Sequence, residues 1–172
     1  MIPAVLVLAT LAFRALGALG VRRFASWPAS AAHGMAVMLL FTASAHFVPA
    51  SVTVMPNHAD LARMVPPFLP FADGLVYVTG VLEFLAAAGL VLTATRWPAA
   101  LGLAALFVTL LPANIYAATA DVAFNGDPAT PLWQRIPEQL LYIAVALWIA
   151  RASDSTATRR LLNRTSKENV YS

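Results

Sequence analysis

Long apolar segments are the feature that most constrains the fold of this chain. They occupy most of its 172 residues, and only short polar connections separate them. A helix of about 20 apolar residues spans the ~30 Å hydrocarbon layer of a membrane. Charged residues make up 11% of the chain, whereas soluble domains average about 25%. The sequence therefore predicts an all-α integral membrane protein. The predicted spans are residues 2–20, 28–49, 73–93, 98–120 and 131–150.

The distribution of basic residues predicts the orientation of these spans. Arg14, Arg22 and Arg23 lie at or just beyond the end of the first span, and Arg96 follows the third. The tail after the fifth span is also basic, whereas the loop after the fourth is acidic. Because cytoplasmic connections carry an excess of arginine and lysine, the N-terminus is expected outside and the C-terminus in the cytoplasm.

The chain is expected to contain one domain. Residues 1–151 are predicted to form a single transmembrane helical domain, and residues 152–172 a basic cytoplasmic tail. A cleaved signal peptide is the alternative interpretation of the first span. That alternative leaves the orientation of the other four spans unchanged.

The absence of cysteine narrows the chemistry. A chain without cysteine has no disulfide, no thiolate metal site and no thiol redox centre. Its three histidines show no metal-ligand spacing, and no flavin, haem or nucleotide motif is recognisable, so we expect no cofactor held by the chain itself. The net charge of +3 is explained by membrane orientation. The expected partner is the lipid bilayer and not nucleic acid.

Polar side chains inside or beside the spans form the candidate site. Glu83 lies about ten residues into its helix, and a carboxylate at that depth is costly unless it has a ligand or a buried partner. The other polar groups fall on the same, outer side, whereas the inner half is almost purely apolar. This convergence predicts a ligand-binding pocket in the outer half of the bundle, with no catalytic residue assigned. The candidate ligand-binding residues are His46, Arg63, Glu83, Asn114, Arg135 and Gln139.

Several of these residues also have a purely structural interpretation, and the sequence leaves both open. An ion pair with Arg135 or Arg63 that ties helices together accounts for Glu83 equally well. Pro112 frees the backbone carbonyl four residues before it, and Asn114 is explained as well by repair of that kink as by ligand binding.

Short motifs along the chain follow one another in the order found in a known family. They lie at the end of the second span, before and within the third, at the proline of the fourth and at the start of the fifth. They are His46-Phe47, Arg63-Met64-Val65-Pro66-Pro67, Thr79-Gly80-Val81-Leu82-Glu83, Pro112-Ala113-Asn114-Ile115-Tyr116 and Arg135-Ile136-Pro137-Glu138-Gln139. With these motifs the chain resembles the DoxX family of small bacterial membrane proteins over residues 31–151.

The resemblance implies a multi-pass protein of the bacterial inner (plasma) membrane. Its fold would be the four-helix transmembrane bundle of that family, with one extra N-terminal transmembrane helix. That family includes a subunit of thiosulfate:quinone oxidoreductase. We therefore expect an accessory subunit of a quinone-linked membrane redox system, and not an enzyme on its own. A quinone is the candidate ligand, and a soluble or membrane oxidoreductase is the candidate partner.

Two other functions also fit the sequence. A small transporter or lipid-binding protein is favoured by the proline in the fourth span and by the proline-rich loop before the third. Five spans are few for alternating access unless the protein forms a homodimer. A non-catalytic membrane scaffold is the third function, and it predicts polar groups that close on one another without a cavity.

Overall fold

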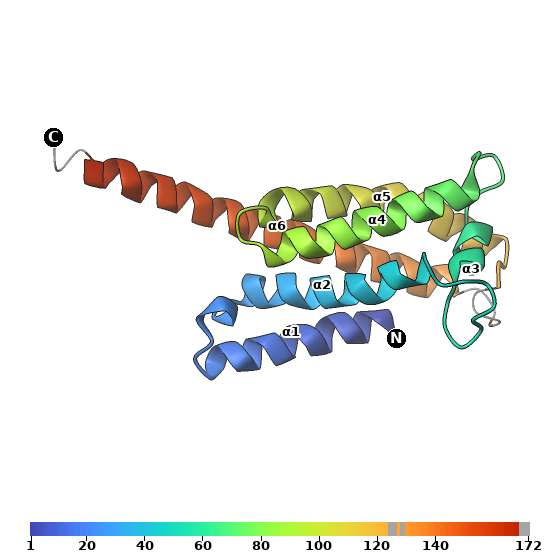
Figure 1. The fold of residues 1–172 in the computed structure, drawn as a ribbon, viewed down its shortest axis with the longest axis horizontal. Coiled ribbons are helices and arrows are strands. Elements are labelled where there is room, and N and C mark those ends of the chain that lie inside the picture. Colours follow the sequence, from blue (N-terminus) through green and yellow to red (C-terminus); the bar gives the residue numbers. More distant parts are fainter. Residues whose placement is uncertain (124–126, 128–129, 169–172) are drawn as a thin grey trace.

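The regular structure of the described chain is helical (Figure 1). The computed structural model describes residues 1–123, 127 and 130–168, with side chains as far as residue 154 in the last helix. The helices are α1 (Ile2–Ala18), the short 3-10 helix η1 (Arg22–Phe24), α2 (Trp27–Ala45), α3 (His58–Arg63), α4 (Ala72–Val91), α5 (Arg96–Thr119) and α6 (Leu132–Glu168). The all-helical prediction is confirmed, and each predicted span forms a helix.

Four of these helices form a closed bundle. Helix α2 packs against α4, α4 against α5 and α5 against α6, and α6 returns to α2. Helix α1 lies outside this ring against α2, along one edge of the molecule in Figure 1. The turn at η1 and the α4–α5 turn lie at one end of the bundle, whereas α3 and the chain's N-terminus lie towards the other.

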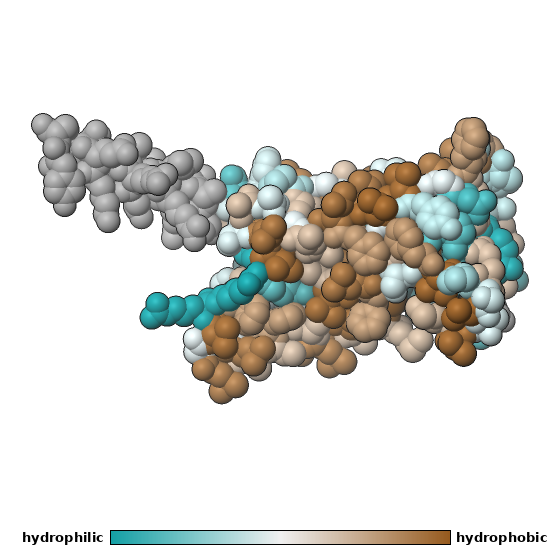
Figure 2. Space-filling view, viewed as in Figure 1, coloured by the Kyte–Doolittle hydropathy of each residue, from teal (hydrophilic) through white to brown (hydrophobic). Residues whose placement is uncertain are grey.

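Within the described residues, three helices, α2, α4 and α5, are long and apolar enough to cross a membrane. Their outward surfaces are apolar too: Tyr77, Val78 and Leu85 of α4 are all exposed. Figure 2 shows hydrophobic residues over the middle of the helices on this face and hydrophilic residues gathered towards the ends. Water-soluble monomers rarely expose apolar patches this extensive, so the surface fits a hydrocarbon environment.

The last helix is longer than the predicted span. The span was expected to end at residue 150 with a basic tail beyond it, and α6 is one helix of 37 residues that continues to Glu168. The physical reason is that neither proline nor glycine interrupts residues 151–168, so nothing in the polar segment breaks the helix.

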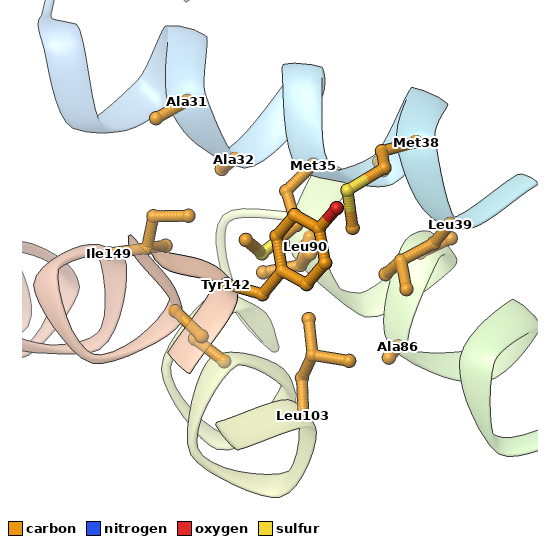
Figure 3. Close-up of a cluster of buried hydrophobic side chains, with 14 of the residues drawn as sticks. Ala31, Ala32, Met35, Met38, Leu39, Ala86, Leu90, Leu103, Tyr142 and Ile149 are labelled. Carbon is orange, nitrogen blue, oxygen red and sulfur yellow. The ribbon is translucent and has the colours of Figure 1, made fainter. Parts of the chain in front are cut away.

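The core consists of side chains from all four bundle helices (Figure 3). Tyr142 of α6 extends its ring towards Met35 and Met38 of α2. Alanine residues occupy much of the rest of the core, and small side chains of this kind let helix backbones approach closely. The largest fully buried side chains of the core are Met35, Met38, Leu39, Leu90, Leu103 and Ile149.

The α4–α5 turn is held by arginines. Arg96 Nε donates to the Leu90 carbonyl at 2.8 Å, and Arg23 Nη2 donates to the Val91 carbonyl at 3.0 Å. These carbonyls end α4 and have no partner within the helix. Positive charge is favourable at a helix C-terminus. The basic residues at this end of the bundle therefore also supply hydrogen-bond donors for the last carbonyls of α4.

The proline-rich loop between α3 and α4 is partly buried and partly projecting. Pro66 is fully buried, whereas Phe68 is 77% exposed and Phe71 is 85% exposed. Phe71 adopts a left-handed backbone (φ 60°) immediately before α4. The first half of the loop is therefore packed into the protein, whereas its second half exposes apolar rings at the surface.

Candidate functional site

The carboxylate of Glu83 is buried at the contact between α2 and α4. The residue is 4% exposed. Thr42 Oγ1 donates a hydrogen bond to Glu83 Oε2 at 2.6 Å, and His46 Nε2 lies 3.6 Å from Glu83 Oε1. A hydroxyl and an imidazole from α2 thus face a carboxylate from α4 inside an apolar bundle. We call Thr42, His46 and Glu83 the carboxylate cluster.

Helical spacing and one glycine create this cluster. Thr42 and His46 are four residues apart, so they lie on the same face of α2. Gly80 lies one turn before Glu83 on α4, directly opposite His46. A Cβ atom at Gly80 would lie 2.6 Å from the His46 Cβ, well inside the 3.5–4.0 Å at which carbon atoms make good contact. The missing side chain is what brings α2 within hydrogen-bonding distance of Glu83.

The two ring nitrogens of His46 face different partners. Its Nδ1 lies 2.7 Å from the Val76 carbonyl, an acceptor, so Nδ1 carries a hydrogen. The other nitrogen, Nε2, faces Glu83. Either Nε2 is protonated and His46 is a cation, or the carboxylate itself is protonated. A bare imidazole nitrogen facing a bare carboxylate is repulsive, so a proton on either group stabilises this contact.

A second imidazole–carboxylate pair lies between this cluster and the surface. His58 Nδ1 lies 2.8 Å from the His46 carbonyl, and His58 Nε2 lies 3.0 Å from Asp73 Oδ1. The Asp73 side chain is 79% exposed. Since the His46 carbonyl can only accept, His58 Nδ1 donates to it, and His58 Nε2 is within ion-pair distance of Asp73. The two pairs are joined by the backbone of His46 alone.

The remaining intramembrane candidates are on α5 and α6. Arg135 Nη1 donates to Asn114 Oδ1 at 2.7 Å, and Asn114 Nδ2 donates to the Leu110 carbonyl at 3.1 Å. Gln139, one turn beyond Arg135, donates from Nε2 to the Phe107 carbonyl at 2.9 Å. These contacts tie α6 to α5 around the proline of α5.

Arg63 lies apart from both groups. Its guanidinium pairs with Asp60 within α3, and its side chain is 60% exposed. Asp60 also completes a capping box with Asn57 at the start of the same helix. Arg63 therefore belongs to the local structure of α3.

The candidate residues that were predicted to converge form two separate groups in the structure. Glu83 and His46 come together, and Arg135 and Asn114 come together. The alternative in which Glu83 pairs with Arg135 or Arg63 is not what the structure shows, because the ionisable partner of Glu83 is His46.

Sequence reasoning missed two parts of the site. One is Thr42, which the four-residue spacing to His46 could have identified. The other is the pairing of His58 with Asp73. Among the described residues, no group of three or more histidine, aspartate or glutamate side chains is placed to hold a metal ion.

One family model matches the chain, described as a domain of unknown function (DUF8561), over residues 35–150. The match includes the carboxylate cluster and the α5–α6 contacts, and it excludes α1 and η1. No curated protein and no solved structure matches the chain. The expected membership of the DoxX family is therefore wrong. The motifs behind it are short, and kink prolines, capping arginines and a lone buried carboxylate recur in membrane helices for general physical reasons.

Proposed function

This chain belongs to the DUF8561 family, whose function is unknown, and we propose that it is a multi-pass protein of the bacterial inner membrane that binds an amphiphilic ligand at the carboxylate cluster. The ligand is a quinone or a molecule of similar chemistry, and the protein serves a membrane redox enzyme as an accessory subunit. The basic end of the bundle faces the cytoplasm. The carboxylate cluster then lies between the middle of the membrane and its outer face.

The observation that carries this proposal is the buried contact between Glu83 and His46, whose Oε1 and Nε2 atoms lie 3.6 Å apart. A carboxylate in a hydrocarbon layer is costly, and buried carboxylate–histidine pairs in membranes commonly exchange protons or bind ligands. The 2.6 Å bond from Thr42 and the approach of His46 stabilise the carboxylate in this environment. A ligand oxygen that accepts a hydrogen bond can therefore be bound and protonated at this position.

The cluster has an edge that a membrane-dissolved ligand can reach. Thr42 is only partly buried, and three aromatic rings lie beside the cluster on the α2–α4 surface. The ring of Phe47 lies 5.6 Å from that of Phe84 and 5.7 Å from that of Tyr77. Both Phe47 and Tyr77 are more than 40% exposed. Aromatic rings favour stacked or edge contacts with another ring, so this surface suits a ligand with a flat ring and an apolar tail.

The second imidazole pair supports a proton supply from the outer side. His58 stacks on Tyr77 at 4.1 Å and contacts the exposed Asp73. Asp73 and His58 can exchange a proton with water at the outer surface, and the His46 carbonyl that accepts from His58 holds this pair next to the carboxylate cluster. The chain contains no cysteine, so under this proposal a partner oxidoreductase supplies or removes the electrons.

The test is retention of a quinone by the purified protein. We would incubate the protein in mild detergent with a short-chain ubiquinone analogue and count bound molecules by native mass spectrometry. Replacing Glu83 with Gln keeps the shape and the bond from Thr42 but removes the carboxylate. We expect E83Q to lose roughly tenfold or more in affinity, the size of one charge-assisted hydrogen bond.

The matched control is Glu138→Gln, which changes a carboxylate of α6 that accepts a hydrogen bond from Gln134. Its quinone binding should equal that of the wild type. Equal quinone binding by wild type, E83Q and E138Q would refute the ligand site.

A membrane scaffold is the second candidate, favoured by the way the polar groups pair. Arg135 contacts Asn114, Gln139 contacts a backbone carbonyl, and Glu83 contacts two side chains of α2. A scaffold predicts that E83Q lowers the resistance of the helices to unfolding while the wild type binds no quinone. The same preparation therefore separates the two functions.

A further inference from the structure

A groove lies on the side of the bundle formed by α1, α2 and α6. Helices α1 and α6 each pack against α2, and a groove of about 250 Å³ lies between them. Its floor includes the small side chain of Ala31, and Thr10 is the only hydroxyl-bearing residue of its wall. The lining residues are Leu6, Val7, Thr10, Leu11, Trp27, Ala31, Leu141, Val145 and Trp148. A groove with this lining accepts a hydrocarbon and offers almost nothing to a polar ligand.

A basic side chain stands at one end of the groove. The Arg14 guanidinium lies over the ring of Trp27, 5.5 Å from its centroid, and Trp27 lines the groove. Arg14 Nε is buried and has no hydrogen-bond partner within the described part of the chain. A buried donor without an acceptor is unfavourable. Because other atoms cover Nε, an anion bound at this end of the groove would contact the guanidinium through its terminal nitrogens.

The charge on α1, η1 and α2 around Arg14 is of one sign. Arg22 and Arg23 follow α1, and the first acidic residue of the whole chain is Asp60. No carboxylate of α1, η1 or α2 is therefore available to balance these arginines. Tryptophan and arginine are typical of the membrane interface on the cytoplasmic side, where anionic lipids attract basic residues.

The dimensions fit one lipid chain. From Leu141 to Trp148 the groove follows α6 for ~10 Å at 1.5 Å per residue, which is about two thirds of one ~15 Å leaflet. A flat interface with a second copy of the protein would need a much larger area than this groove.

We propose that this groove holds one acyl chain of an anionic phospholipid, whose phosphate accepts hydrogen bonds from Arg14. The inference rests on the membrane placement proposed above but not on the carboxylate cluster. Since α1, η1 and Trp27 precede the matched residues 35–150, the phosphate-binding end of this site is a property of the N-terminal segment of this chain.

The experiment uses the full chain in nanodiscs that contain equal amounts of phosphatidylglycerol and phosphatidylethanolamine. Bound lipid is identified by native mass spectrometry after gentle release. We expect one retained phosphatidylglycerol in the wild type and a roughly fivefold loss of that preference in Arg14→Gln, the effect of one arginine at an anionic surface. Arg22→Gln removes the same charge from an exposed residue that does not line the groove, and it should keep the preference.

A third variant tests the acyl chain. Val7 is 49% exposed and lines the groove, so Val7→Trp fills the groove from its rim without disturbing the core. It should abolish retention of the lipid. Equal losses in R14Q and R22Q, equal retention of the two lipids, or a lipid-free dimer would each overturn the proposal. Quinone binding at Glu83 should be unchanged in R14Q, and carbonate extraction of membranes tests the membrane placement separately.

Discussion

Replacing Gly80 with alanine tests whether the close approach of α2 and α4 forms the carboxylate cluster. The new Cβ would lie 2.6 Å from the His46 Cβ, 2.8 Å from the His46 Cγ and 2.9 Å from the Phe47 Cε2. Favourable carbon contacts are ~3.5–4.0 Å, so the two helices must separate by about 1 Å. The bond from Thr42 to Glu83 would then lengthen from 2.6 Å beyond the range of a hydrogen bond.

The expected change in the free energy of unfolding of G80A is the sum of three contributions. Overpacking costs ~1–3 kcal/mol, and loss of a hydrogen bond to a charged group costs ~1.5–3 kcal/mol. Alanine regains about 1 kcal/mol of helix propensity over glycine. The expected net destabilisation of G80A is about 1.5–5 kcal/mol.

The control is Gly102→Ala in α5, because a Cβ at Gly102 meets nothing within 4 Å. That variant should be slightly more stable than the wild type, by up to ~1 kcal/mol. Unfolding in mixed detergent micelles with rising dodecyl sulfate, followed by helical circular dichroism, measures both variants. If G80A and G102A unfold at the same detergent fraction, the close contact at Gly80 does not hold the cluster together.

Two further substitutions test single hydrogen bonds by the same unfolding assay. Thr42→Val removes the donor to Glu83 at nearly constant shape and should lower the free energy of unfolding by about 1–3 kcal/mol. Thr42→Ser keeps the hydroxyl and should stay close to the wild type. Equal stability of the two variants would show that the hydroxyl contributes nothing. Gln139→Leu leaves the carbonyl of Phe107 without its partner and should lower the free energy of unfolding by ~0.6–1.7 kcal/mol. Gln134→Leu should be nearly neutral. A larger effect at Gln134 than at Gln139 would contradict the role of Gln139 in joining α6 to α5.

The helices could be predicted from the sequence because apolar length alone determines them. The predicted second span, residues 28–49, became α2 over Trp27–Ala45, and the third, residues 73–93, became α4 over Ala72–Val91. Hydrocarbon length sets these segments, and capping residues and turns move their ends by a few positions. The continuation of α6 was missed because the apolar stretch ends at residue 150 while the helix does not.

The candidate site could be predicted only in part. Glu83 and His46 stand out because titratable groups are rare in apolar helices. Their partners depend on which helix faces cross and how closely, and the sequence does not show this. Thr42 resembles any helical threonine until Gly80 brings α2 near. By charge alone, Glu83 was the obvious partner for Arg135. Because α6 packs on α5, the guanidinium of Arg135 instead donates to the side-chain amide of Asn114.

Helix α6 extends far beyond the rest of the bundle. Its 37 residues extend ~55 Å at 1.5 Å per residue, and the part beyond Arg151 accounts for ~25 Å of this length. In Figure 1 it leaves the bundle as a single straight arm. A lipid headgroup layer adds only about 6 Å on each side of the hydrocarbon. A fluorophore attached at the last turn of α6 would thus stand ~20 Å clear of the headgroups, and energy transfer to a membrane dye would report whether this arm stays upright or bends down.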